Sequence, residues 1–558
     1  MNQIYNFLGT VKNPAGKGDE NVSQPLGSTL FSRTIALWAI MLISGLWASG
    51  MFAQSTYYSK AGATDFNSVA SWGTATDGTG AAPATISNAD NFVVANSAAL
   101  TLSGNASVRQ LTVTSGSLTV AANTLTVGIA AQKNSVLLIN GGTFTVSGGT
   151  VNIDGYLSYT SGNFNQSGGA IVIDPNNGGA TATSTTSSQY TLNITAANAV
   201  NWTGGSITLL DPPASTSTTH YSVYYNTSAT AEVSTSHTIR FGNGVSADAG
   251  GSTANFLVYN YVGSGKLNWG NFDVYGPSAN NRKVRLYTYS NGVRGNVNIY
   301  DTAELDMNSI TMYLGNVNVA SGGIWTASGT AYFALASSTS YVTATAPVTV
   351  NIASGATVRN AATTPTANLY QLTVNHSNAG GVTFTGTSAI SGQPAGALSV
   401  SSTITFVSGK ASAMGNMPVV LGTSTPSTGT FSYTSGGFAS GTTFGRWFTA
   451  AGTGSAIAAG EATTATSRYA FVTAAGIDRS AWIERVTPSN AAGVLAIKYN
   501  ESAGVTAVNL TDGAATLDVR ANDSWSVSEL AGTPTAAASF KLQLRAPGVF
   551  GAALNAAS

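Results

Sequence analysis

Cysteine is absent from the 558-residue sequence, and only 8% of its residues are charged. The missing thiols exclude disulfides, cysteine nucleophiles and cysteine-ligated metal sites. The 22 lysines and arginines balance 22 aspartates and glutamates, so the formal net charge is zero. Such a chain has neither a basic footprint for nucleic acid nor an acidic tail, and we expect no nucleic-acid partner.

Histidine is also scarce, and His220, His237 and His376 share no spacing that a zinc site or a catalytic triad would need. Calcium is the one metal with candidate ligands, in the turns that begin at Asp77 and Asp174. Neither turn has the D-x-D-x-D-G spacing of a calcium loop. We interpret both as plain turns and expect no cofactor and no metal.

Long hydrophobic runs are missing except for one, TIALWAIMLISGLWASGMFA, which follows Arg33. A basic flank, an apolar run and the small residue Ala53 are typical of a signal peptide cut before Gln54. The alternative is an uncleaved membrane anchor, because the run approaches the ~18–20 residues that span a bilayer. We predict that residues 1–53 are a signal peptide with a long N-terminal region, so that the protein is secreted and meets a membrane only through export or anchoring.

Glycine, by contrast, is abundant, with 63 residues, and it returns every seven residues from Gly141 to Gly169. Apolar and polar side chains alternate within these blocks, as in Phe144-Thr145-Val146, which is the period-two pattern of a strand. The pattern predicts that Phe144 is buried and that Thr145 is exposed or hydrogen-bonded along a ladder. Such short strands, with glycines at the corners, could form an antiparallel meander or a solenoid.

A longer repeat favours the solenoid. The tetrapeptide GNVN begins at Gly295 and again at Gly315, 20 residues later, and this period is typical of stacked rungs. We predict a parallel β-helix (β-solenoid) of about 20–21 residues per rung over residues 93–427, with residues 54–92 as its N-terminal cap. Across residues 212–291 the repeat is poorly kept and tyrosine is frequent, which we interpret as rungs with longer loops.

The charge pattern changes toward the C-terminus. No acidic residue occurs from Met307 to Gly460, whereas residues 461–558 contain eight acidic and seven basic side chains. The segments GVLAIKYN and SWSVSEL indicate the longer strands of an antiparallel sandwich. We predict a β-sandwich domain over residues 428–558, which is truncated at its C-terminus.

One group of charged residues is a candidate catalytic site. Asp301, Glu304 and Asp306 lie close together, and the basic residues just upstream are Arg282, Lys283, Arg285 and Arg294. Glu304 and Asp306 are two residues apart, so on a strand both point outward. Paired carboxylates could cleave a glycosidic bond, and carboxylates with Ca²⁺ and a basic residue could eliminate across a uronate. The alternative is a solvated face on which opposite charges balance between rungs.

Aromatic side chains supply the other candidate contacts. Trp72, Trp202 and Trp325 could stack on sugar rings if they are exposed. Trp202 and Trp325 lie in strand-like segments, which favours a place in the core or as end plugs over contact with a sugar.

The segment from Tyr57 to Asn96 resembles the opening of large secreted surface proteins of Bacteroidota, in which a YYSK start and a WGT...DG.G.AP motif lead into β-strand repeats. The matching residues are Tyr57 to Lys60, Trp72 to Thr74, Asp77, Gly78, Gly80, Ala82 and Pro83. Two segments nearer the C-terminus resemble a sandwich module that follows such repeats: FGRWFTAAGTGSAIAAGE and SAGVTAVNLTDGAATLDVRANDSWSVS. The resemblance implies export through a type IX secretion system and an adhesin-like role. It carries no catalytic residues, and the sorting domain usual in that group is not found after Arg545.

We therefore expect a non-catalytic structural or adhesin-like protein at the cell surface, associated with the cell outer membrane through export or anchoring. Its expected partner is an extracellular polysaccharide or another surface ligand. The alternative is a polysaccharide lyase or glycosidase on the same β-helix, using Asp301, Glu304, Asp306 and Arg285. A phage tail spike would share the fold, but the signal peptide argues against it.

Overall fold

The computed structural model describes residues 54–129, 135–173, 190–212, 221–244, 255–261, 267–275, 283–334, 346–376, 378–386, 392–423, 428–448, 467–485, 491–512, 515–535 and 540–545. The protein is all-β over these residues. They contain strands β1 to β42 and one short 3₁₀ helix, η2 (Val69–Ser71). In the part of the chain that is described, no helix is long and apolar enough to cross a membrane. Ser55–Ser558 forms one compact unit.

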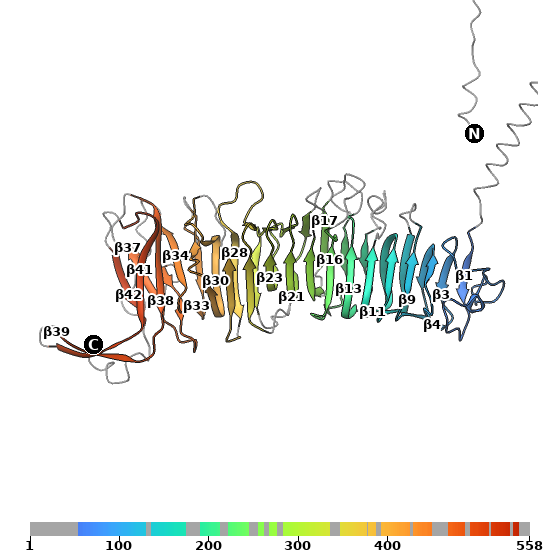
Figure 1. Cartoon of the computed structure of the whole chain (residues 1–558), viewed down its shortest axis with the longest axis horizontal. Helices are drawn as coiled ribbons and strands as arrows, with labels where there is room; N and C mark the ends of the chain where they lie inside the picture. The colour runs from blue at the N-terminus through green and yellow to red at the C-terminus, as the bar shows by residue number, and fades with distance from the viewer. Residues whose placement is uncertain are drawn as a thin grey trace, which may run out of the picture. The chain divides into compact units, whose positions relative to one another are not determined.

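Most strands pair in parallel, and they follow one another in chain order (Figure 1). The pairs form three ladders, here called A, B and C, and the longest strands belong to more than one of them.

Ladder A contains β1 (Thr56–Ser59), β3 (Asn91–Val94), β6 (Gln110–Val113), β9 (Ser135–Val146), β11 (Gly155–Ile173), β12 (Leu192–Ile194), β14 (Val223–Asn226), β17 (Phe256–Tyr261), β20 (Lys283–Tyr287), β22 (Glu304–Asp306), β24 (Ile324–Thr326) and β27 (Thr357–Arg359).

Ladder B first contains β4 (Ala99–Thr101), β7 (Ser117–Val120), β9, β11 and β13 (Asn201–Leu209). It is followed by β15 (Ala231–Glu232), β18 (Leu267–Trp269), β21 (Asn291–Ile299), β23 (Met312–Val319), β25 (Thr330–Ala334), β28 (Leu369–His376), β30 (Leu398–Ala413) and β32 (Thr430–Tyr433).

Ladder C contains β5 (Ala106–Val108), β8 (Thr124–Val127), β10 (Thr150–Ile153), β11, β13, β16 (His237–Phe241), β19 (Asn271–Val274), β21, β23, β26 (Val348–Ile352), β29 (Val382–Gly386), β30, β33 (Gly437–Ala439) and β36 (Phe471–Val472).

The two copies of the 20-residue sequence repeat lie on neighbouring strands that pair in register. Asn296 on β21 lies opposite Asn316 on β23, and Asn298 lies opposite Asn318. In both pairs the amide of the later asparagine donates to the earlier one, at 3.0 and 2.9 Å. The two GNVN segments therefore lie side by side in register, as a repeat of this period predicts.

Apolar side chains alternate into a continuous core. Phe144 is completely buried, whereas Thr145 is partly exposed and accepts a hydrogen bond from Asn165 at 3.5 Å. Asn201 continues this row by donating to Asn165 at 3.3 Å. The predictions that Phe144 is buried and that Thr145 is hydrogen-bonded along a ladder are therefore confirmed. The physical cause is that successive residues of a strand point to opposite faces.

The glycine blocks differ from prediction in one respect. The sequence suggests separate short strands, but β9 runs through Gly141 and β11 runs through Gly162 and Gly169. These three glycines have positive φ angles, and the register of β11 shifts around Gly162 and again before residue 170. The chain therefore bends at glycine bulges and passes from one ladder to the next within a single strand, from A to B at Gly141 and Gly162 and from B to C at Gly169.

Aromatic residues gather at the first strands of the ladders. The indole of Trp72 lies edge-on to Phe66 and Phe92, with ring centroids 5.2 and 4.9 Å apart. Tyr57 stacks on Phe92 at 5.6 Å. β1 pairs in parallel with β3 and antiparallel with β2 (Trp72–Gly73). Residues 54–92, which the sequence predicts to be a cap, thus pack aromatic rings against the first strands of the core.

Pairing changes direction at the other end. Within the predicted sandwich region, β32, β33 and β34 (Thr443–Phe448) still pair in parallel with earlier strands, β34 through β31 (Val419–Leu421). β34 then pairs antiparallel with β38 (Gly493–Asn500), and β38 pairs with β41 (Ser524–Gly532). A second antiparallel sheet contains β35 (Arg468–Tyr469), β37 (Ala481–Arg485) and β42 (Phe540–Leu544). A hairpin joins β39 (Val505–Asp512) and β40 (Ala515–Ala521).

Candidate functional site

The candidate carboxylates lie on ladder A, where the successive strands β20, β22, β24 and β27 bring charged and polar residues into register. Lys283 on β20 is opposite Glu304 on β22, and Arg285 is opposite Asp306. Parallel pairing repeats the same face from strand to strand, so outward residues of neighbouring strands become neighbours in space. Leu305, between the carboxylates, is completely buried. As predicted, the carboxylates point away from the core.

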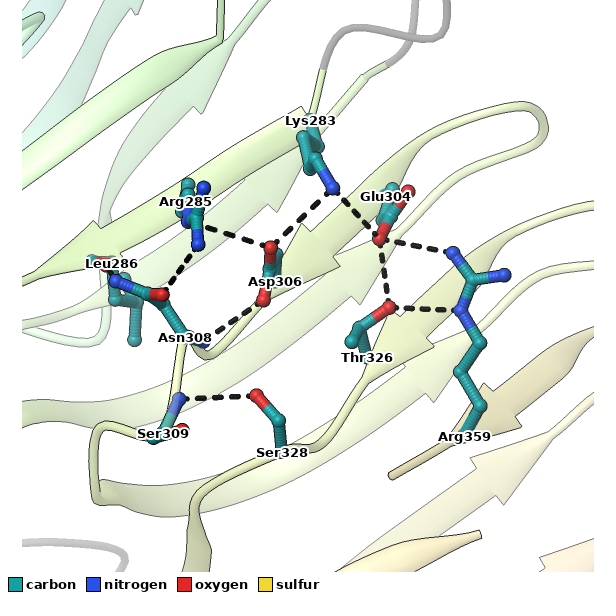
Figure 2. Close-up of polar contacts among 10 residues, drawn as sticks. All are labelled: Lys283, Arg285, Leu286, Glu304, Asp306, Asn308, Ser309, Thr326, Ser328 and Arg359. Atoms are coloured by element: carbon teal, nitrogen blue, oxygen red, sulfur yellow. Dashed lines mark hydrogen bonds and ion pairs between the residues drawn. The ribbon is translucent and has the colours of Figure 1, made fainter. Parts of the chain in front are cut away.

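Figure 2 shows how the cations surround these carboxylates. Lys283 Nζ lies 3.6 Å from Glu304 Oε1 and 3.4 Å from Asp306 Oδ2, so it bridges the two acids. Arg285 Nε lies 3.6 Å from Asp306 Oδ2. Arg359 Nη2 on β27 lies 3.1 Å from Glu304 Oε1. Two acids and three cations therefore form one ion-pair network across β20, β22 and β27.

Neutral groups complete the network. The Thr326 hydroxyl on β24 donates to Glu304 Oε1 at 2.7 Å and accepts from Arg359 Nε at 3.0 Å. Asp306 Oδ1 accepts the backbone N–H of Asn308 at 2.9 Å. Asn308 Oδ1 accepts from Arg285 Nη2 at 2.6 Å. Hydrogen bonds of this kind, made to charged groups, are the stronger ones in proteins.

The cations lie over the acids. The side chains of Glu304 and Asp306 are 11% and 9% exposed. Those of Lys283 and Arg285 are 24% and 42% exposed, and that of Arg359 is 21% exposed. A glycosidase must bring carboxyl oxygens against the scissile bond, whereas here Glu304 Oε1 and Asp306 Oδ2 face cations of the same chain. The ion pairs and hydrogen bonds thus connect β20, β22, β24 and β27 of ladder A.

The other predicted site residues fall elsewhere. Asp301 is exposed in the turn between β21 and β22, outside the contacts of the ion-pair network. Asp77 is exposed in a turn, where hydrogen bonds from the hydroxyl and N–H of Thr79 lower the pKa of its carboxyl group. Arg294 pairs with Glu232 at 3.7 Å, outside the ion-pair network. Asp174, His220 and Arg282 lie outside the described residues. Over the residues the structure describes, no group of three His, Cys, Asp or Glu side chains could hold a metal ion.

The proposed sugar contacts of the tryptophans need correction. Trp72, Trp202 and Trp325 are at most 1% exposed. Each takes an inward position: Trp325 follows the alternation of β24, opposite Leu305, and Trp202 packs edge-on against Phe164 at 5.5 Å. Their rings fill the core because the period-two pattern points them inward, so none offers a face to a sugar.

His237 is buried beside Trp202. The two rings stack at 5.0 Å, and the imidazole Nε2 donates to Gln166 Oε1 at 3.1 Å. Burial lowers the pKa of His237 to about 3. Nδ1 is buried and makes no hydrogen bond within the described residues, so a second proton there would be an uncompensated charge in the core.

We therefore expect acid to destabilise the fold through His237. In the unfolded chain its pKa is near 6.5, so below that pH the unfolded state takes up a proton that the folded state refuses. Above pH ~6.5 His237 is neutral in both states and does not lower the free energy of unfolding. Between that pH and the folded-state pKa, the free energy of unfolding falls by roughly 1 kcal/mol per pH unit. Urea denaturation of wild type and His237→Gln between pH 7 and pH 4 measures it. An equal loss of stability with pH in both proteins would contradict the assignment.

Sequence reasoning missed Thr326 and Arg359. Arg359 lies 55 residues beyond Glu304 in the chain, and the intervening segments are of irregular length, so no local spacing relates the two. The register of β22, β24 and β27 supplies the link, since Asp306, Thr326 and Arg359 lie opposite one another.

Comparison with known proteins gives no relative: no family model, curated protein or solved structure matches the chain.

Proposed function

We propose that ladders A, B and C are the three sides of a parallel β-helix and that the protein is a secreted, adhesin-like component of the cell surface without catalytic activity. The antiparallel strands from β34 onward would form a sandwich that follows the helix. The chain would serve as a stalk that displays binding surfaces, held together by rung-to-rung hydrogen bonds and capped at its first strands.

The observation that carries this proposal is that outward polar side chains bind their neighbours on adjacent rungs. On ladder C, Arg240 Nε contacts Asp273 Oδ2 at 3.3 Å, and Asn298 donates to Asp273 Oδ1 at 2.7 Å. Asn318 continues the row by donating to Asn298. The ion-pair network of ladder A follows the same rule with charges. A surface whose polar groups are satisfied by the scaffold suits a structural role.

The alternative is a polysaccharide lyase or glycosidase, and one observation favours it. Glu304, Asp306 and a basic residue do converge, with Lys283 within 3.6 Å of Glu304 and 3.4 Å of Asp306. Acidic and basic groups at such distances occur in catalytic sites as well as in structural ion pairs.

Incubation with acidic and neutral polysaccharides separates the two functions. We expect binding without new reducing ends and without the ultraviolet absorbance of unsaturated uronates, because the carboxylates are covered by their cations. Release of either product by the wild type, and its loss in Glu304→Gln, would overturn the structural proposal. Boiled protein and buffer alone control for hydrolysis of the substrates.

A further inference from the structure

Seven tyrosines gather on the outside of ladder A, on β14, β17 and β20 and the residues beside them. We call this group the tyrosine surface; it contains Tyr190, Tyr221, Tyr224, Tyr259, Tyr261, Tyr287 and Tyr289. Register places Tyr224 opposite Tyr259, and Tyr259 opposite Tyr287. All except Tyr221 are partly exposed, and Tyr289 is 40% exposed.

The rings pack on one another along the ladder. Tyr224 stacks on Tyr190 at 4.2 Å and on Tyr259 at 4.8 Å, with interplanar angles of 22° and 21°. Tyr221 contacts Tyr259 and Tyr287 at 4.7 and 5.3 Å. Both faces of Tyr224 are covered, and its hydroxyl oxygen accepts a hydrogen bond from Asn226 Nδ2 at 2.6 Å. The ring edge and the O–H donor are what remains for a ligand. The surface is thus a rigid row of phenol edges, and little side-chain entropy is left to lose on binding.

The core does not require these tyrosines. Val258, Val284 and Leu286 fill the inward positions of β17 and β20 and are at most 1% exposed. On the preceding strands the positions in register with Tyr224 are Asn193 and Ser158, which hydrogen-bond to each other at 3.1 Å. The outward row therefore changes from small polar residues to aromatic ones at β14. Partly exposed aromatic clusters of this kind are typical of binding surfaces.

Positive charge lies directly beside the tyrosines. Arg285 is two residues from Tyr287 on the outward side of β20, and Lys283 is two residues further back. Both cations lie over their acidic partners and are more exposed than them. A ligand on this surface therefore meets phenol groups on one side and ammonium and guanidinium groups on the other.

We propose that the tyrosine surface, together with Lys283 and Arg285, binds an anionic polysaccharide; this rests on the proposed adhesin function and names its site and ligand class. Sugar hydroxyls exchange hydrogen bonds with the phenol hydroxyls, which both donate and accept. Carboxylate or sulfate groups of the sugar bind the exposed sides of Lys283 and Arg285. The in-register column from Tyr224 to Tyr287 covers two strand spacings, roughly 10 Å, which favours an extended chain over a single sugar.

Isothermal titration calorimetry of the full chain tests the proposal with polygalacturonate, dextran sulfate and neutral dextran. We expect the two anionic polymers to bind, more weakly as salt rises, and dextran to bind least. The uronate and sulfate arms tell which anion is preferred. The double variant Tyr259→Ser/Tyr287→Ser should weaken anionic binding about tenfold or more. Should the serine variant fail to fold, Tyr259→Phe/Tyr287→Phe keeps the stack and removes only the hydroxyls, and weaker binding is again expected.

Matched controls lie on the other ladders. Tyr313 and Tyr332 on ladder B form a ring pair at 4.7 Å, and Tyr313→Ser/Tyr332→Ser should leave binding unchanged. Arg285→Gln should weaken binding, whereas Arg240→Gln should not, although Arg240 is 43% exposed and also pairs with an aspartate. Binding that survives all tyrosine-surface variants would overturn this site and leave the adhesin function standing. Cleavage of a polymer would overturn the adhesin function, and no binding to any polymer would overturn the site.

Discussion

Glu304→Gln is expected to lower the free energy of unfolding by about 2–4 kcal/mol, because it removes one acid from a covered ion-pair network and leaves Lys283 and Arg359 without their shared partner. The carboxylate is 11% exposed, so little water replaces the lost contacts. Glutamine keeps the size of the side chain, which restricts the change to its charge. Urea denaturation followed by circular dichroism measures the effect.

Glu232→Gln is the matched control. Glu232 on β15 pairs with Arg294 at 3.7 Å, but its side chain is 47% exposed. Exposed pairs contribute ~0–1 kcal/mol because water and salt screen them. If both variants lose equally little stability, the network of ladder A is not structural, and the same carboxylates become available for the alternative enzymatic function.

Gly162→Ala is expected to destabilise the fold by roughly 2–5 kcal/mol, from a positive φ together with overpacking. Gly162 has a φ of +90°, and a Cβ atom there would lie 2.1 Å from the carbonyl oxygen of Gly142 on the neighbouring strand. Neither backbone can withdraw without breaking its hydrogen bonds to the next strand. Thermal and urea denaturation should both report the loss.

Gly415→Ala separates the two causes. Gly415 has a similar φ of +70°, but no atom lies within 4 Å of an added Cβ. Gly415→Ala should lower the free energy of unfolding by only the penalty for a positive φ, about 1–2 kcal/mol. Equal losses at the two positions would mean that close stacking of neighbouring strands does not constrain Gly162.

Local residue patterns predicted much of the fold. Alternation in Phe144-Thr145-Val146 correctly separated inward from outward side chains, and the 20-residue return of GNVN correctly paired Asn298 with Asn318. Both succeed because strand period and rung length are properties of adjacent residues. The tyrosine surface was visible only as a composition bias across residues 212–291, because the loops between its strands hide the register that aligns Tyr224 with Tyr259.

The sequence by itself therefore determined an all-β chain, the faces of its strands and the outward position of Glu304 and Asp306. Only the tertiary structure decided what surrounds those acids and where the tryptophans lie. Arg359 reaches Glu304 across strands that are distant in sequence. The inward-pointing Trp325 is fully buried because β24 lies between β22 and β27. The physical reason is that alternation fixes the direction of a side chain, whereas its charge partners and its exposure depend on which strands become neighbours.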